Sequence, residues 1–230
     1  MAVKAAIGMG MHQIHENDLI FTDEDRTLRR RIWRSLFALD QMISLMYGRP
    51  LSISEDDYDS DIMESTTSKE KNPPDSRSSA QDAVLMLSQT AGEICTRIYN
   101  GDDVSLRTMR EISEKLVKRA NLFSRWVDTT RLQNGSLTPV EVFSIINTHL
   151  YAYFIAIVMT RPFFFRHWNM SVKGLDSDPE LIKIGMSQLH DAVPSLHLSQ
   201  ACVDASVSTI CLILYTWESG RLSRRTPSLL

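Results

Sequence analysis

The chain has 230 residues, 43% hydrophobic and 23% charged, which is the composition of an ordinary globular protein with a sizeable core. Its formal net charge is −3, so it lacks the excess of basic residues with which proteins grip nucleic-acid phosphates. The three cysteines are too few and too scattered for a disulfide scaffold or a CxxC zinc site. Only 9 glycines and 8 prolines interrupt the chain, which favours helices over a turn-rich β architecture.

The first well-defined helix is expected between Thr22 and Gly48, after a short apolar helical segment at 2–11. Thr22 and Asp25 form a near capping box, with Asp in place of the usual Glu or Gln. Gly48 is a natural residue just past a helix end, and Pro50 prevents continuation. Between them, apolar residues recur at steps of three and four and predict one buried stripe, widened by Trp33 and Phe37: Leu28, Ile32, Leu36, Leu39, Ile43 and Met46.

The composition changes sharply at about 52–82. This segment begins with six acidic residues within 55–64 and continues with a tract rich in Ser, Thr, Lys and Pro. Such a stretch buries too little apolar surface to order itself, so we expect a mobile loop with an acidic start. A solvated linker is the simpler interpretation of the acidic run, and an acidic activation segment is the alternative.

Helical periodicity resumes at 84–98 and continues at 109–127. A strong start signal follows: Thr138 as N-cap, Pro139 at the first position and Glu141 completing a capping box. The helix from there to Thr160, which we expect Arg161-Pro162 to end, is apolar around most of its circumference. Its segment 142–159 is long enough to span a bilayer, but polar residues near its middle favour a buried central helix.

Two further helices are expected in the last quarter of the chain. Ser177, Asp178 and Pro179 predict the start of a short amphipathic helix, and the last helix should run from about Ser199 to Trp217. No segment carries a strand signal. The sequence therefore predicts one all-α domain over 1–230, an irregular array of helices with a central buried helix and no sheet.

Reactive chemistry is sparse. His12 and His15, with Glu16 nearby, have no second ligand cluster at metal-like spacing, so no metal site is predicted. We likewise predict no catalytic or cofactor-binding residue, because no acid, base and nucleophile combine. One speculative ligand pocket is placed between the 139–160 helix and its neighbours, with three polar residues at its wall: His149, Tyr153 and Arg161.

Two charged features of the 22–48 helix need partners. Arg29, Arg30 and Arg31 spread over most of the helix circumference, so we expect them to be solvated and to pair with local acids. Asp40 lies beside the apolar stripe, and a partly buried carboxylate requires a partner. Arg49, just past the helix end, is expected to form a structural ion pair with it.

The same residues carry a family resemblance. The runs RRRIWRSLFALD at 29–40 and YGRPLSI at 47–53, followed by the acidic 55–59, resemble the hallmark of the fungal-specific transcription factor domain. This domain is the middle homology region of fungal zinc binuclear-cluster transcription factors. The signature residues are Arg30, Arg31, Trp33, Phe37, Asp40, Gly48, Arg49 and Pro50. Weaker similarities follow in the family's order at 2–12, at 149–163 and at 202–205.

The resemblance implies a non-enzymatic regulatory domain that acts in RNA polymerase II transcription in the nucleus through ligand, partner or intramolecular contacts. The expected partners are a small-molecule effector, transcriptional co-regulators and a second copy of the chain, with no membrane. Zinc and DNA would be bound only by a cysteine cluster outside this N-terminally partial chain. A small-molecule-sensing, cluster-less regulator is the alternative, and a helical enzyme is a remote one.

Overall fold

The structure, a computed structural model, describes residues 2–13, 19–63, 76–99, 105–123, 129–132, 137–173 and 189–220. These residues form helices and turns with no strand among them, so the all-α prediction is confirmed. The chain divides into two compact units, one comprising Met1–Asp103 and Ile112–Val127, the other Val104–Glu111 and Asp128–Leu230. That both units act as one domain stays a prediction.

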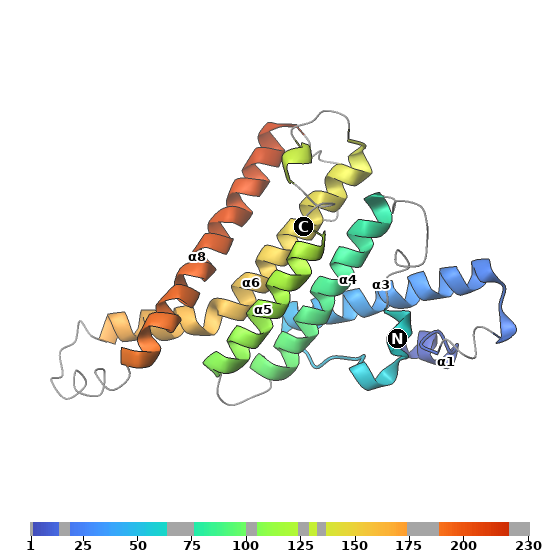
Figure 1. Cartoon of the computed structure of the whole chain (residues 1–230), viewed down its shortest axis with the longest axis horizontal. Coiled ribbons are helices and arrows are strands. Elements are labelled where there is room, and N and C mark those ends of the chain that lie inside the picture. Colours follow the sequence, from blue (N-terminus) through green and yellow to red (C-terminus); the bar gives the residue numbers. More distant parts are fainter. Residues whose placement is uncertain are drawn as a thin grey trace. The chain divides into compact units, whose positions relative to one another are not determined.

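The first unit is built around a long helix, α3 (Asp23–Tyr47), which packs against α1 (Ala2–Gly8) and α4 (Ser76–Ile94) (Figure 1). Its other elements are the two 3₁₀ turns η1 (Glu55–Asp57) and η2 (Ser60–Ile62), the π turn η4 (Cys95–Tyr99), and the later part of α5 (Leu106–Phe123). All segments of the signature therefore lie in this unit.

The second unit contains the start of α5, the 3₁₀ turn η5 (Thr129–Leu132), α6 (Pro139–Lys173) and α8 (Leu189–Glu218). Helices α6 and α8, yellow-orange and red in Figure 1, pack along each other. Pro139–Phe165 and His197–Glu218 are long and apolar enough to cross a membrane. Core helices of soluble proteins pass the same test, and 44% of the first window and 22% of the second are buried.

Both ends of α3 form as predicted. The Thr22 side chain accepts a hydrogen bond from the Asp25 backbone N–H at 3.3 Å, and its hydroxyl donates to the Asp25 carboxylate at 2.7 Å. At the other end Gly48 has φ 62° and ψ 35°, a left-handed conformation that a β-carbon would strain. Local capping chemistry thus sets the limits of this helix.

The predicted buried face of α3 is confirmed for Trp33 and Phe37 but wrong for the aliphatic stripe. The five stripe residues Leu28, Ile32, Leu39, Ile43 and Met46 are between 37% and 57% exposed, and Leu36 is half-buried. The buried side chains are instead Trp33, Phe37, Gln41, Ser44 and Leu45. Each of the two aromatic side chains buries more apolar area than a single aliphatic side chain would, and the two polar side chains, Gln41 and Ser44, bond the segment after the helix.

The expected mobile loop at 52–82 is wrong at both of its ends. Ile53 and Ile62 are fully buried, and Ser54 forms a reciprocal capping box with Asp57 across η1. Helix α4 begins at Ser76, earlier than the periodicity indicated. Apolar side chains scattered in the acidic run are sufficient to order it, because the core of α3 accepts them. Residues 64–75 lie outside the described part of the chain.

Helix α6 does not end at Arg161-Pro162 as predicted but continues to Lys173. Proline inside a helix costs about 3 kcal/mol, because it has no N–H to donate and its ring crowds the preceding turn. Burial of Phe163 and Met159 on either side offsets this cost, at roughly 1.5–3 kcal/mol for each side chain. Helix α8 also begins earlier than predicted, at Leu189, and most of the predicted 177–189 helix falls outside the described residues.

Candidate functional site

Side chains from segments far apart in sequence meet Trp33 and Phe37 of the signature in one buried core. Trp33 is 0% exposed, and Phe37 beside it is also buried. Tyr58, from the acidic segment, places its ring edge-on to Phe37, with centroids 5.5 Å apart. The other members come from α1 and its following turn, from the segment after α3 and from α4: Ala6, Met11, Ile53, Ile62 and Leu85. Trp33 and Phe37 are thus packing residues of this core.

A tight turn, residues 48–50, connects α3 to this acidic segment, and we call it the Gly-Arg-Pro corner. The Arg49 N–H donates to the Ser44 carbonyl at 3.0 Å, which closes the helix end. The Ser44 hydroxyl donates to the Pro50 carbonyl at 3.3 Å. These bonds fix the direction in which the chain leaves the helix and return residues 51–53 to its surface.

Asp40 holds the returning chain, but not in the way predicted. Its Oδ2 accepts the backbone N–H groups of Ser52 at 2.9 Å and Ile53 at 3.0 Å. The Arg49 guanidinium lies over the Tyr47 ring, 5.6 Å from its centroid. The predicted Asp40–Arg49 ion pair is therefore wrong, because two backbone donors lie closer to the carboxylate and satisfy it.

Arg34 is a structural residue that the sequence reading missed. Its Nε donates to the Ile62 carbonyl at 2.9 Å, and its Nη1 lies 3.3 Å from the Asp82 carboxylate, both side chains being mostly buried. Burial lowers the pKa of Arg34, while the charge of Asp82 acts in the opposite direction. The pair ties η2 to α4 and to α3. This ion pair was not predicted, because positions 34 and 82 are 48 residues apart in the sequence.

The three arginines at 29–31 have different surroundings. Arg29 donates to the Met9 carbonyl and lies over the Phe21 ring, 4.1 Å from the centroid. Arg30 is half-buried and Arg31 is exposed. Arg29 thus connects α3 to the turn after α1, although no specific role had been predicted for it.

A pocket of about 520 Å³ lies under the Gly-Arg-Pro corner. One wall is α3 with the corner, and the other is the end of α4 with η4 and one residue of α5. Its apolar lining includes Phe37, Leu51 and Ile53. Its charged lining consists of Arg49, Arg97, Lys115 and Glu93. This is a concave site of the size that small molecules occupy.

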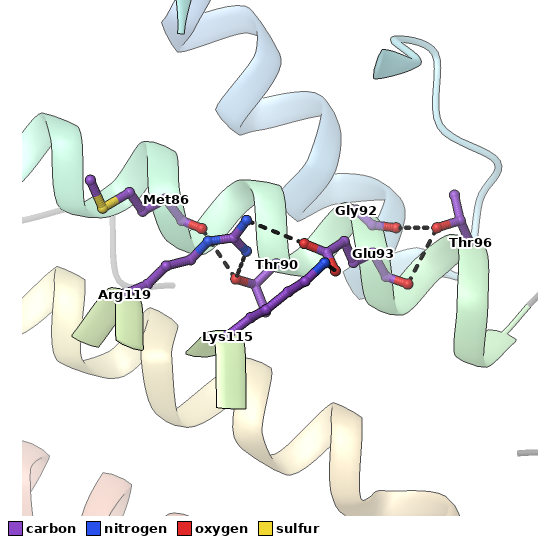
Figure 2. Close-up of polar contacts among 7 residues, drawn as sticks. All are labelled: Met86, Thr90, Gly92, Glu93, Thr96, Lys115 and Arg119. Carbon is purple, nitrogen blue, oxygen red and sulfur yellow. Dashed lines mark hydrogen bonds and ion pairs between the residues drawn. The ribbon is translucent and has the colours of Figure 1, made fainter. Parts of the chain in front are cut away.

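Glu93 is held firmly on the wall of this pocket (Figure 2). Lys115 Nζ lies 2.7 Å from one carboxylate oxygen, and Arg119 Nη2 lies 3.2 Å from the other. Arg119 also donates to the Thr90 hydroxyl, which is buried on α4. Two cations from α5 therefore compensate one acid on α4, and the carboxylate has little freedom to reorient.

Gly92 permits a close approach of the Gln41 side chain of α3 to α4. A β-carbon there would lie 2.1 Å from Gln41 Oε1, and Gln41 is 2% exposed and donates to the Ile53 carbonyl at 3.2 Å. Gly92→Ala is expected to lower the free energy of unfolding by up to about 2 kcal/mol, since overpacking costs about 1–3 kcal/mol and the better helix propensity of alanine returns about 1 kcal/mol.

Urea denaturation followed by circular dichroism measures this effect. Combining Gly92→Ala with Gln41→Ala is the control, because the double variant removes the clash and should cost less than the two single changes added together. Strict additivity of the two costs would contradict the steric explanation.

Cys95 lines the pocket as a protonated thiol. Burial, and in second place the charge of Asp40, raise the pKa of Cys95 to about 11. Because the thiolate is the reactive form, we expect iodoacetamide at pH 8 to alkylate exposed Cys211 at least about tenfold faster than Cys95. Peptide mass spectrometry gives both rates. They should converge in strong denaturant, and equal rates in the folded protein would contradict the assignment.

The second unit holds the other three predicted site residues. His149 and Tyr153 are half-buried on α6 with ring centroids 6.0 Å apart, and exposed Arg161 lies 5.4 Å from the Phe165 ring centroid. None of the three lines the pocket under the corner. A ligand site around them stays a prediction.

His12 lies in the first unit against Trp33, with ring centroids 5.7 Å apart. His15 and Glu16, its predicted neighbours, fall outside the described residues. Across the part of the chain that the structure describes, no three His, Cys, Asp or Glu side chains gather in a way that could hold a metal ion.

The chain belongs to the fungal-specific transcription factor domain family, whose model matches residues 1–130. The match covers the signature core, the corner and the pocket walls. The later similarities at 149–163 and 202–205 lie beyond the matched residues and stay predictions. No solved structure matches this chain significantly.

The curated relatives are fungal proteins that are named as regulators, one of them as a transcriptional regulator. The chain is 22% identical over 222 residues to filamentous growth regulator 27 of Candida albicans, covering 92% of this chain and 27% of that protein. It is 42% identical over 59 residues to the acetamidase regulatory protein of Aspergillus fumigatus, covering 26% of this chain and 8% of that protein. A transcriptional regulatory protein of Schizosaccharomyces pombe is 37% identical over 59 residues, which are 26% of this chain and 7% of that protein. The chain thus spans about a quarter or less of these relatives.

Proposed function

We propose that this chain is the regulatory part of a fungal transcription factor, one that governs RNA polymerase II transcription in the nucleus without itself contacting DNA. The observation that carries the proposal is the signature core. By this we mean the buried cluster around Trp33 and Phe37, whose members are all apolar and serve packing. Asp40 beside it is used to accept two backbone N–H groups. The formal charge of −3 also suits a module that leaves DNA contact to another part of the protein.

Regulation would pass through contacts of the folded chain with an effector, a co-regulator or a second copy. DNA binding, and the zinc it requires, would belong to a cysteine cluster elsewhere in the whole protein. The family and the relatives are named as regulators and not as enzymes.

The experiment that tests this proposal fuses residues 1–230 to a heterologous DNA-binding domain and measures a reporter gene in yeast. The fusion is expected to change transcription relative to the DNA-binding domain alone. A fusion carrying Trp33→Ala should lose the effect, because the core fails, while Trp168→Ala at an exposed position should keep it. A wild-type fusion without influence on the reporter would contradict the proposal.

A small-molecule sensor is the second candidate, and the pocket under the corner is the observation in its favour. Selective binding of an effector to the folded state would stabilise it and could shift the protein between active and inactive forms.

A further inference from the structure

The pocket under the Gly-Arg-Pro corner has the shape of a small-molecule site. Its volume of about 520 Å³ lies within the range of roughly 300–1,000 Å³ typical of ligand pockets. Phe37 and Ile53 supply a buried apolar surface, and Gln41 is fixed by its bond to the Ile53 carbonyl. The Cys95 thiol adds no charge, since burial raises its pKa to about 11. The inner part of the pocket therefore suits a compact apolar group.

The pocket wall carries more positively charged side chains than negatively charged ones. Three cations, Arg49, Arg97 and Lys115, line the pocket together with one carboxylate, that of Glu93. Glu93 is already compensated by Lys115 and by Arg119, as Figure 2 shows. The lining thus carries three positively charged side chains and one negatively charged one, which favours an anionic ligand over a cationic one.

Arg49 is the cation best placed to bind such a ligand. Among the described residues no carboxylate pairs with it, and its guanidinium stacks only on the exposed Tyr47 ring. A planar guanidinium can donate two parallel hydrogen bonds to one carboxylate, a geometry that an ammonium group cannot offer. The corner bonds of Ser44 fix the backbone from which Arg49 projects.

We propose that this pocket binds a small organic acid, with its carboxylate on Arg49 and its apolar body against the lining formed by the half-buried Leu51 and the more deeply buried Phe37 and Ile53. The proposal rests on the regulatory function above, because the ligand would act as the effector of that regulator. It names the chemical class of the effector and the residue that recognises its charge.

Three probes of one shape test the ligand class on the full chain: 3-phenylpropionate, 3-phenylpropanamide and 3-phenylpropylamine. Isothermal titration calorimetry should give a dissociation constant on the order of millimolar for the acid, as expected for so few atoms. The acid should also raise the melting temperature in proportion to its concentration. The neutral amide and the cationic amine should bind at least about tenfold more weakly.

Two variants locate the site. Arg49→Gln should weaken 3-phenylpropionate binding at least about tenfold, whereas Arg110→Gln, the same change at an exposed position of α5 outside the pocket, should leave it unchanged. Thr96→Phe, which fills the pocket and keeps every charge, should also abolish binding. Circular dichroism confirms that each variant is folded before titration.

Absence of acid binding, equal binding of all three probes, or binding unaffected by both Arg49→Gln and Thr96→Phe would each overturn the proposal. Failure here is distinguishable from failure of the regulatory function. A fusion that still changes reporter transcription, combined with no binding of the acid, would remove the pocket's role and leave the regulatory role in place.

Discussion

Trp33→Ala is expected to lower the free energy of unfolding by about 3–5 kcal/mol, the range found when a buried large aromatic side chain is truncated. Trp33 is 0% exposed and packs in the core with residues of α1, α4 and the acidic segment, so its truncation leaves a buried cavity. Because small domains are stable by only about 5–15 kcal/mol, this one change should remove much of the total. Urea unfolding of the full chain, followed by circular dichroism, measures the loss.

Two other changes isolate the cause. Trp168→Ala removes a tryptophan that is 58% exposed and should alter stability by no more than about 0.5 kcal/mol. Trp33→Phe keeps most of the ring and removes an indole N–H that has no hydrogen-bond partner among the described residues. It should cost about 1–2 kcal/mol, since lost volume is partly offset by relief of the unsatisfied donor. Equal costs for Trp33→Ala and Trp168→Ala would contradict the packing of this core.

Asp40→Ala is expected to cost about 2–3 kcal/mol, because it removes the acceptor of two backbone N–H groups. The Ile53 N–H is part-buried and would lose its partner, and the Ser52 N–H would lose its own. Without these two hydrogen bonds, the chain after the Gly-Arg-Pro corner is held less firmly against α3. The same denaturation experiment gives the value, and amide hydrogen exchange at 52 and 53 should speed up.

Conservative replacement separates this role from an ion pair. Asp40→Asn keeps one carbonyl oxygen as acceptor and should cost about 1 kcal/mol, roughly one ordinary hydrogen bond. Arg49→Ala should cost less than about 1 kcal/mol, because exposed charges contribute little and Arg49 does not bond Asp40. If Arg49→Ala cost as much as Asp40→Ala, the two residues would be energetic partners, against the geometry described above.

Stability and recognition thus use different sides of the same corner. Asp40 and Ser44 hold its backbone, while Arg49 faces the pocket and contributes little to folding. Variants at Asp40 and at Arg49 should therefore behave differently in the unfolding experiment and in the ligand-binding experiment. Arg49 variants should fold normally and lose the ligand, whereas Asp40 variants should lose stability first.

The sequence by itself determined the helical class and the two ends of α3. Caps form between residues three or four positions apart, so Thr22, Asp25 and Gly48 define those ends without help from the rest of the chain. The family was also within reach, since the residues of its signature lie in one continuous stretch of about thirty positions.

Only the tertiary structure decided which face of α3 is buried, where α6 ends and what Asp40 binds. Periodicity selected the aliphatic stripe, but burial depends on partners such as Ile62 and Leu85, which lie about thirty to fifty positions away. Pro162 predicts a helix end, because proline inside a helix is costly. Burial of neighbouring side chains in the tertiary structure offsets this cost, and the local sequence does not show that burial. The pocket belongs to the same group, because its walls join residues from 37 to 115 and no local pattern encodes a space between helices.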